Sequence, residues 1–131
     1  MNQQIFQCDR YFTIFDCLVS HGQLLLRSQK DDNYRNNIDI IFFDTHYIQL
    51  LSELNGLCIR ICNDNTISYQ AVKKYLTYDN NHLFEIESGL QRYYIAASFV
   101  TVFENELDFN QSSLNFENIG REREIATSII E

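Results

Sequence analysis

The sequence predicts an α+β fold that is mainly antiparallel β, with six or seven strands curled into a sandwich or partial barrel and one helix at about residues 68–77. Apolar residues recur with the two-residue period of strands along most of the chain. Turn-forming residues separate these segments at short intervals, which favours hairpin connections. By contrast, the segment 68–77 carries Tyr69, Val72 and Leu76 at helical spacing, with Lys73 and Lys74 facing outward.

Length and composition indicate a single domain over residues 1–131. A chain of 131 residues can bury a core without disulfides or metal, and this one contains ten Phe and eight Tyr to fill that core. Proline is absent and glycine occurs only four times, so no flexible linker is expected. We place the core at about 8–110. The polar tail at 111–131 is predicted to be either a short helix, with Ile125 and Ile129 on one face, or a frayed end.

The strands are expected at residues 11–19, 24–27, 38–43, 47–51, 57–62, 83–87 and 92–104. Residues 20–23 and 54–57 are predicted turns, the second because Asn-Gly tolerates the positive φ of tight hairpins. The segment 92–104 is apolar on both faces and is therefore predicted to be one long central strand.

The net charge of −8 and the pI of about 4.7 narrow the choice of partners. Nucleic-acid binders usually carry a basic stripe that displaces counterions from phosphate, and the ten Lys and Arg residues here are scattered. We therefore expect no nucleic acid and no membrane, and instead a basic protein partner. No signal segment and no apolar run of about 18 residues is apparent, so a cytoplasmic location is expected.

No catalytic motif is recognisable, and the chain is not expected to be an enzyme. His21 lies beside Ser20 and five residues after Asp16, but triads are defined by three-dimensional geometry, so a surface turn is the preferred interpretation. Asp44 and His46 would share a strand face, and they are interpreted as a polar strand end because no third partner is visible.

No metal and no cofactor is expected either. Cys58 and Cys62 have a spacing that zinc sites use, but the second ligand pair is missing and Arg60 would lie between them. The cysteines, Cys8 and Cys17 included, are interpreted as reduced, small hydrophobic residues. Four dispersed glycines cannot build a phosphate-binding loop.

Acidic residues at period two are the candidate partner-binding site. Two groups show this spacing: Glu85 with Glu87, and Glu104 with Glu106 and Asp108. On a continuing strand each group would line up on one face. Such a face is either simply solvated or a functional acidic surface.

Several stretches together resemble small uncharacterised bacterial proteins of about this length: SHGQLLLRS at 20–28, NIDIIFF at 37–43, and FEIESG followed by RYYIAAS within 84–98. That resemblance implies no activity and no site residue. In size and acidity the chain also resembles the immunity proteins that neutralise bacterial toxins, which implies a protein-binding role.

We therefore expect an inhibitor of immunity type that neutralises a cationic bacterial toxin, such as a nuclease. One alternative is a small-ligand-binding domain or enzyme with a pocket between strands, lined by Tyr11, Tyr93, Tyr94 and either Arg27 or Arg60. Another is a structural module that oligomerises through an edge strand, so that the chain is a monomer or an edge-strand dimer.

Overall fold

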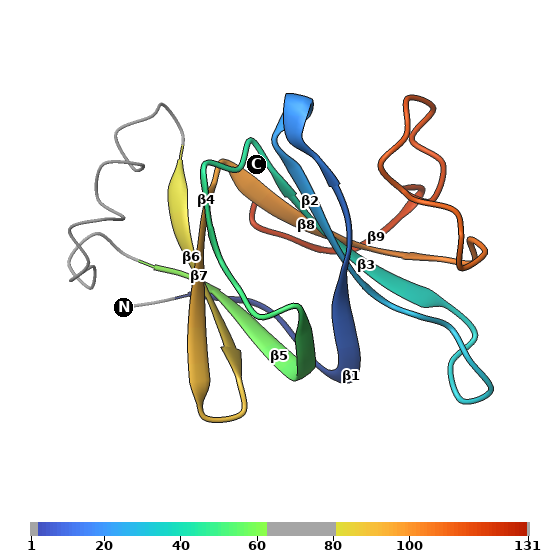
Figure 1. The fold of residues 1–131 in the computed structure, drawn as a ribbon, viewed down its shortest axis with the longest axis horizontal. Coiled ribbons are helices and arrows are strands. Elements are labelled where there is room, and N and C mark those ends of the chain that lie inside the picture. Colours follow the sequence, from blue (N-terminus) through green and yellow to red (C-terminus); the bar gives the residue numbers. More distant parts are fainter. Residues whose placement is uncertain (1–2, 63–80, 131) are drawn as a thin grey trace.

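A computed structural model describes residues 3–62 and 81–130, which form a nine-stranded antiparallel sheet (Figure 1). The strands are β1 (Gln3–Leu18), β2 (Gln23–Ser28), β3 (Asn37–Phe43), β4 (Tyr47–Gln49), β5 (Glu53–Ile61), β6 (His82–Ser88), β7 (Gln91–Ala97), β8 (Phe99–Asn105) and β9 (Arg123–Thr127). A single 3₁₀ turn, η1 (Val19–His21), connects β1 to the β2 hairpin arm.

The predicted α+β class, with six or seven strands and a helix, is wrong. The described residues form nine strands in one sheet and contain no α-helix. The helix predicted at 68–77 lies outside the described residues. Among the residues that the structure describes, no helix is long and apolar enough to cross a membrane.

The sheet has two arms, β4-β7-β6-β5 and β2-β3-β8-β9, which lie on either side of β1. It bends around a core because two stretches of chain run through both arms. The strand order is β4-β7-β6-β5-β1-β2-β3-β8-β9, with β1 in the middle. The sixteen-residue β1 pairs with β5 through its first part and with β2 through its last part. Only Ser98 separates β7 from β8, so the chain again passes directly from one arm to the other. Figure 1 shows the two arms on either side of β1.

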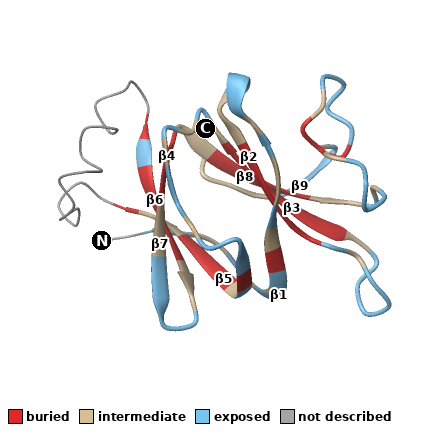
Figure 2. Ribbon diagram, viewed as in Figure 1, coloured by how far each residue is buried: buried red, intermediate tan, exposed pale blue. Residues whose placement is uncertain are grey.

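The two arms meet across one apolar core. The rings of Phe42 on β3 and Phe84 on β6 lie edge to face, with centroids 5.7 Å apart. Both residues are fully buried, as are Phe12, Ile40 and Ile59 in the same cluster. Figure 2 shows buried segments in strands on both sides of the core. Burial of these alternating apolar side chains supplies the main driving force for folding.

A second apolar cluster lies on the outer face of β2, β3 and β8. It contains Leu25, Ile41 and Phe103, and Leu114 from the segment after β8 packs against them. The segment 106–122 therefore covers this face, and residues 123–127 add β9 to the edge of β8. The tail is thus neither the short helix nor the frayed end that was predicted, because the exposed edge and outer face of β8 both bind it.

A buried polar network fixes that covering segment. Asp39 Oδ1 accepts a hydrogen bond from Arg27 Nε at 2.6 Å, and Asp39 Oδ2 accepts one from Arg27 Nη2 at 2.8 Å. The same Oδ2 accepts bonds from Asn105 Nδ2 at 2.9 Å and from Ser113 Oγ at 2.7 Å. Arg27 Nη1 donates to the carbonyl of Gln111 at 2.7 Å. Two charges that are 0–1% exposed are thereby paired and tied to the loop.

Two sequence signals had a different structural meaning from the one predicted. Asn55 and Gly56 lie within β5, where Gly56 has φ +75° and the β1–β5 register shifts between Cys8 and Tyr11. The Asn-Gly pair therefore lies within a strand, opposite one extra residue on β1, and does not form a hairpin turn. The predicted strand 92–104 is interrupted at Ser98. Because both of its faces are apolar, the sequence pattern gave no sign of this break.

A second irregularity occurs where β3 leads into β4. Ser98 N donates to Phe43 O at 2.9 Å and His46 N donates to Ala96 O at 2.8 Å, which leaves one extra residue on the 43–46 side. Asp44 takes φ +53° in this bulge. A Cβ on Gly22 would lie only 3.1 Å from the backbone nitrogen of Thr45 in this bulge. Glycine at position 22 therefore permits the close approach of the two backbones.

Candidate functional site

Two of the predicted acidic residues, Glu85 and Glu87 on β6, lie beside a cation of the same chain. Arg60 on the neighbouring β5 lies 2.7 Å from Glu87 and 3.4 Å from Glu85. The hydrogen bond from Arg60 lowers the pKa of the Glu87 carboxyl from its ordinary value and raises the pKa of the guanidinium. Glu85 is buried, so this pair presents little negative charge to a partner.

The other three predicted residues do not share a strand face, because β8 ends at Asn105. Glu104 is ion-paired with Arg123 of β9 at 3.1 Å, and three-quarters of its side chain is buried. Glu106 and Asp108 lie beyond the strand end and are exposed. The structure therefore separates Glu104 from the two carboxylates that a partner can reach.

Those two carboxylates lie beside the loop 29–36, and together the two loops form a surface that we call the acidic tip. Its exposed members are Asp31, Asp32 and Tyr34 from the first loop, and Glu106, Asp108 and Phe109 from the second.

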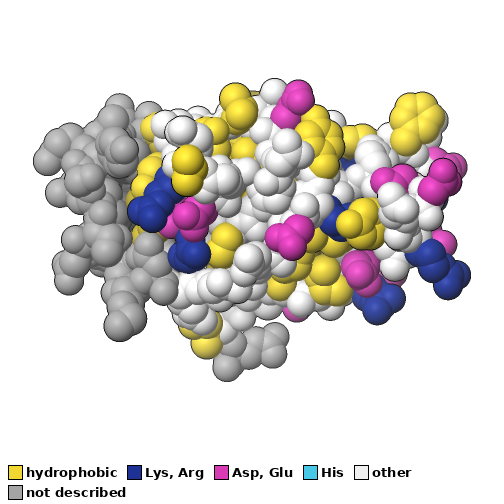
Figure 3. All heavy atoms as spheres, turned by 90° about the horizontal axis from the view of Figure 1, so that it is seen from below, with side chains coloured by type: hydrophobic (Ala, Val, Ile, Leu, Met, Phe, Trp, Pro, Cys, Tyr) yellow, Lys and Arg dark blue, Asp and Glu magenta, His cyan; other side chains and the backbone are white. Residues whose placement is uncertain are grey.

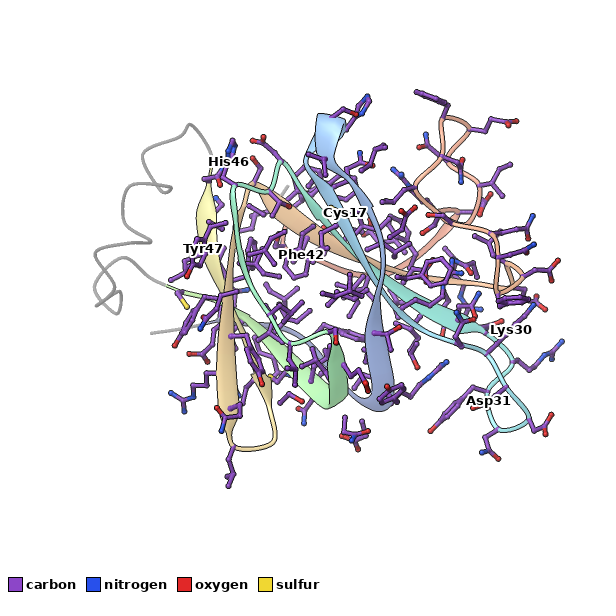
Figure 4. The ribbon with its side chains drawn as sticks, viewed as in Figure 1. Cys17, Lys30, Asp31, Phe42, His46 and Tyr47 are labelled. Carbon is purple, nitrogen blue, oxygen red and sulfur yellow. The ribbon has the colours of Figure 1, made fainter. Side chains whose placement is uncertain are left out.

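Two side chains join the loops of the acidic tip. Lys30 Nζ donates to Glu106 O at 2.6 Å and lies 3.9 Å from the Asp108 carboxylate. Asn37 Nδ2 donates to Leu107 O at 2.9 Å. Figure 4 shows Lys30 and Asp31 at this end of the sheet, far from His46 and Tyr47.

The first loop of the tip is held rigidly by its own hydrogen bonds. Asp31 Oδ1 accepts bonds from the backbone nitrogens of Asn33 at 2.7 Å and Tyr34 at 3.0 Å. The guanidinium of Arg10 stacks on the Tyr34 ring at 4.1 Å and donates to the carbonyl of Asn36 at 2.9 Å. This loop therefore needs little ordering when a partner binds.

The second loop is held just as firmly. The backbone nitrogen of Asp108 donates to Gln111 Oε1, and Gln111 N donates back to Asp108 O, both at 2.9 Å. The Gln111 carbonyl is in turn the acceptor for the buried Arg27. The loop is thus tied to the ion pair beneath it.

The composition of the acidic tip suits recognition of a basic protein. Phe109 is 76% exposed and Tyr34 is 45% exposed, so two aromatic rings face solvent on ordered loops. Exposed aromatic side chains with a polar surround are typical of interface anchors. Four carboxylates surround them, against three cationic side chains: Lys30, Arg35 and the Arg10 that stacks on Tyr34. Figure 3 shows acidic, basic and apolar side chains mixed at the right-hand end of its view.

Sequence reasoning did not identify the aromatic part of this surface. Tyr34 and Phe109 each fall in a polar stretch without periodicity. An isolated aromatic residue in a polar loop is the one signal that was available, because burying such a ring is the usual outcome.

The structure does not assemble a triad around His21. Ser20 Oγ and His21 Nδ1 lie 2.9 Å apart, but Asp16 instead accepts a hydrogen bond from Ser112 Oγ at 2.5 Å. At the 43–46 bulge, His46 Nε2 and Asp44 Oδ1 lie 3.2 Å apart. Asp44 Oδ2 also accepts a bond from Ser98 Oγ at 2.7 Å, so the bulge places three polar side chains together.

The cysteines do not form a metal centre in the described structure. Cys58 and Cys62 are buried, and no disulfide joins any of the four described cysteines. Burial raises the pKa of the Cys58 thiol. Across residues 3–62 and 81–130, no three His, Cys, Asp or Glu side chains gather as a metal site requires.

Comparison of the chain with protein-family models, with curated proteins and with solved structures found no match. The acidic tip and the chemistry of its exposed residues are therefore the structural basis for assigning a function.

Proposed function

We propose that this chain is a protein-binding inhibitor of immunity type, and that the acidic tip binds a cationic toxin such as a nuclease. The observation that carries the proposal is the exposure of Phe109 and Tyr34 among four carboxylates on two loops held by hydrogen bonds. Glu106 and Asp108 belong to this surface. Glu85, Glu87 and Glu104 are paired with Arg60 or Arg123 and are not part of the proposed interface.

The two kinds of side chain have separate roles in this mechanism. The carboxylates steer a basic partner toward the tip, which mainly raises the association rate and makes it sensitive to salt. The aromatic rings bury apolar surface once the complex forms, which mainly lowers the dissociation rate. A nuclease whose basic groove is covered in this way cannot bind phosphate.

The test is capture of partners from a lysate of the source organism with tagged protein, at low and at moderate salt. Wild type is compared with Asp32→Lys, with Phe109→Ala and with Glu124→Lys. Asp32 and Glu124 are both exposed, and reversing either one changes the net charge equally. The Glu124 variant, on β9, is therefore the matched control for the tip.

We expect wild type and Glu124→Lys to retain one basic protein at low salt and to lose it as salt rises. Asp32→Lys is expected to slow association of that protein by about tenfold, and Phe109→Ala to speed its dissociation by about tenfold. The purified partner should lose its nuclease activity when wild type is added. Equal weakening by Asp32→Lys and Glu124→Lys would place the interface elsewhere, and capture that no tip variant weakens would refute the proposal.

A further inference from the structure

A groove of about 650 Å³ runs along the outside of the sheet, between the turn after β1 and the loop before β9. Figure 1 shows the two segments side by side at the top of its view. Ser20 and His21 line one wall, and Phe116, Glu117 and Arg121 line the other. The volume lies within the range of roughly 300–1,000 Å³ that is typical of small-molecule sites.

Arg121 brings a cation to the groove without a carboxylate to neutralise it. Its Nε donates to the carbonyl of Ser113 at 2.7 Å, and its guanidinium lies 5.7 Å from the centre of the Phe43 ring. Neither Nη nitrogen has an acceptor among the described residues. Partial burial lowers the pKa of Arg121, so water solvates this charge poorly. An anion that enters the groove gains two unused donors in fork geometry.

Phe116 provides an apolar contact surface in the same groove. This ring is 95% exposed, and its only described aromatic neighbour is His21, at 6.4 Å in an edge-to-face arrangement. An aromatic ring that is held so far out of the core leaves its face available to a planar group.

The loop that carries Phe116 and Arg121 is ordered without a ligand. Asn115 Oδ1 accepts a hydrogen bond from Ile119 N at 2.9 Å, and Asn115 Nδ2 donates to Ile119 O at 2.9 Å. The same Nδ2 also donates to the Ser112 carbonyl at 3.1 Å. One side-chain amide therefore closes the loop and orders the wall of the groove that carries Phe116 and Arg121.

We propose that this groove binds a small aromatic anion, with its phosphate or carboxylate on Arg121 and its ring against Phe116 and His21. The exposed carboxylate of Glu117 on the same wall opposes the ligand charge, so it limits the affinity. The site lies apart from the acidic tip and does not depend on the function proposed above.

The test uses phenyl phosphate, inorganic phosphate and phenol as probes, each titrated into the full chain and followed by backbone and arginine Nε–H NMR signals. Phenyl phosphate is expected to bind with a dissociation constant of about 1 mM or tighter and to shift signals of residues 18–23 and 114–121. Inorganic phosphate and phenol should each bind roughly tenfold more weakly, because each lacks one of the two contacts.

Three variants separate the contributions. Arg121→Gln is expected to weaken the binding of phenyl phosphate by about tenfold or more. Phe116→Ala is expected to weaken that binding by several-fold without affecting thermal stability. Glu117→Gln should tighten binding by about two- to threefold. If Arg121→Gln unfolds because its Ser113 contact is lost, the other two variants still decide the matter. Equal binding of phenol and phenyl phosphate, or shifts outside the groove, would overturn the proposal.

Discussion

Replacing Asp39 tests whether the buried ion pair holds the C-terminal segment to the sheet. Asp39 is fully buried on β3 and accepts four hydrogen bonds, two of them from Arg27. Asp39→Ala removes all four acceptor contacts and leaves the Arg27 guanidinium, itself 1% exposed, without a counter-charge.

The magnitude follows from that burial. Removing one partner of a buried ion pair costs about 3–5 kcal/mol, because the remaining charge stays desolvated. Domains of this kind have unfolding free energies of about 5–15 kcal/mol, so Asp39→Ala removes roughly a fifth of the total or more. Asp39→Asn should be nearly as damaging, since an amide nitrogen in place of Oδ2 would face three donors.

Urea denaturation monitored by circular dichroism measures the free energy of unfolding of each variant. The control is the double variant Arg27→Met with Asp39→Leu, which removes both charges and fills the space with apolar atoms. We expect it to be more stable than Asp39→Ala by about 2 kcal/mol or more. Hydrogen exchange should also show residues 106–111 opening more readily in Asp39→Ala, because Gln111 depends on Arg27.

Two results would refute this reasoning. One is a loss below about 1 kcal/mol in Asp39→Ala, which would mean that the guanidinium finds water or another acceptor. The other is a double variant whose loss equals the sum of the losses in the single variants Arg27→Met and Asp39→Leu, since the pair would then contribute no coupling.

Three further predictions concern backbone conformation, titration and thiol reactivity. Gly22→Ala should lower the free energy of unfolding by about 2–3 kcal/mol, and Gly89→Ala should lower it by about 1 kcal/mol. Both glycines have φ near +60°, but of the two only Gly22 is crowded by backbone. Equal losses in chemical denaturation would contradict the close contact at Gly22. The carboxyl pKa of Glu87, followed by NMR, should lie below 4.5 and return toward it in Arg60→Met. Because the pKa of Glu87 is lower in the folded than in the unfolded chain, this pair stabilises the fold fully at pH values above the unfolded-state pKa. The stabilisation is lost as the pH falls through the folded-state pKa. In maleimide labelling at neutral pH, the exposed Cys17 should react before the two buried cysteines, and simultaneous labelling of all sites would count against their burial.

Most strands were predictable because alternation is a local property of the chain. In β3, Ile38, Ile40 and Phe42 face the core as their spacing predicts. The division of alternate residues between two faces fails in the segment 92–104. The core contains Ile95 and Ala97 before Ser98, but the even-numbered Val100 and Val102 after it. Both faces there are apolar, so no local pattern marks the switch.

The candidate site was predictable only in part, for a related reason. Acidic residues at period two were visible, but their meaning depended on where β8 ends and on which cations lie beside them. Arg60 reaches Glu87 from 27 positions away, and Lys30 reaches Glu106 from 76 positions away. No property of the acidic residues themselves indicates these pairings.

The sequence by itself determined that the chain is acidic, rich in strands and provided with alternating apolar residues for a core, because each of these depends on composition or on neighbours a few positions apart. The tertiary structure decided the strand order, the covering of the outer face by 106–122 and the meeting of the two tip loops. These depend on contacts such as Arg27 with Gln111, 84 positions apart. Such contacts form only when the whole sheet has bent around its core and has buried charges that must then find a partner.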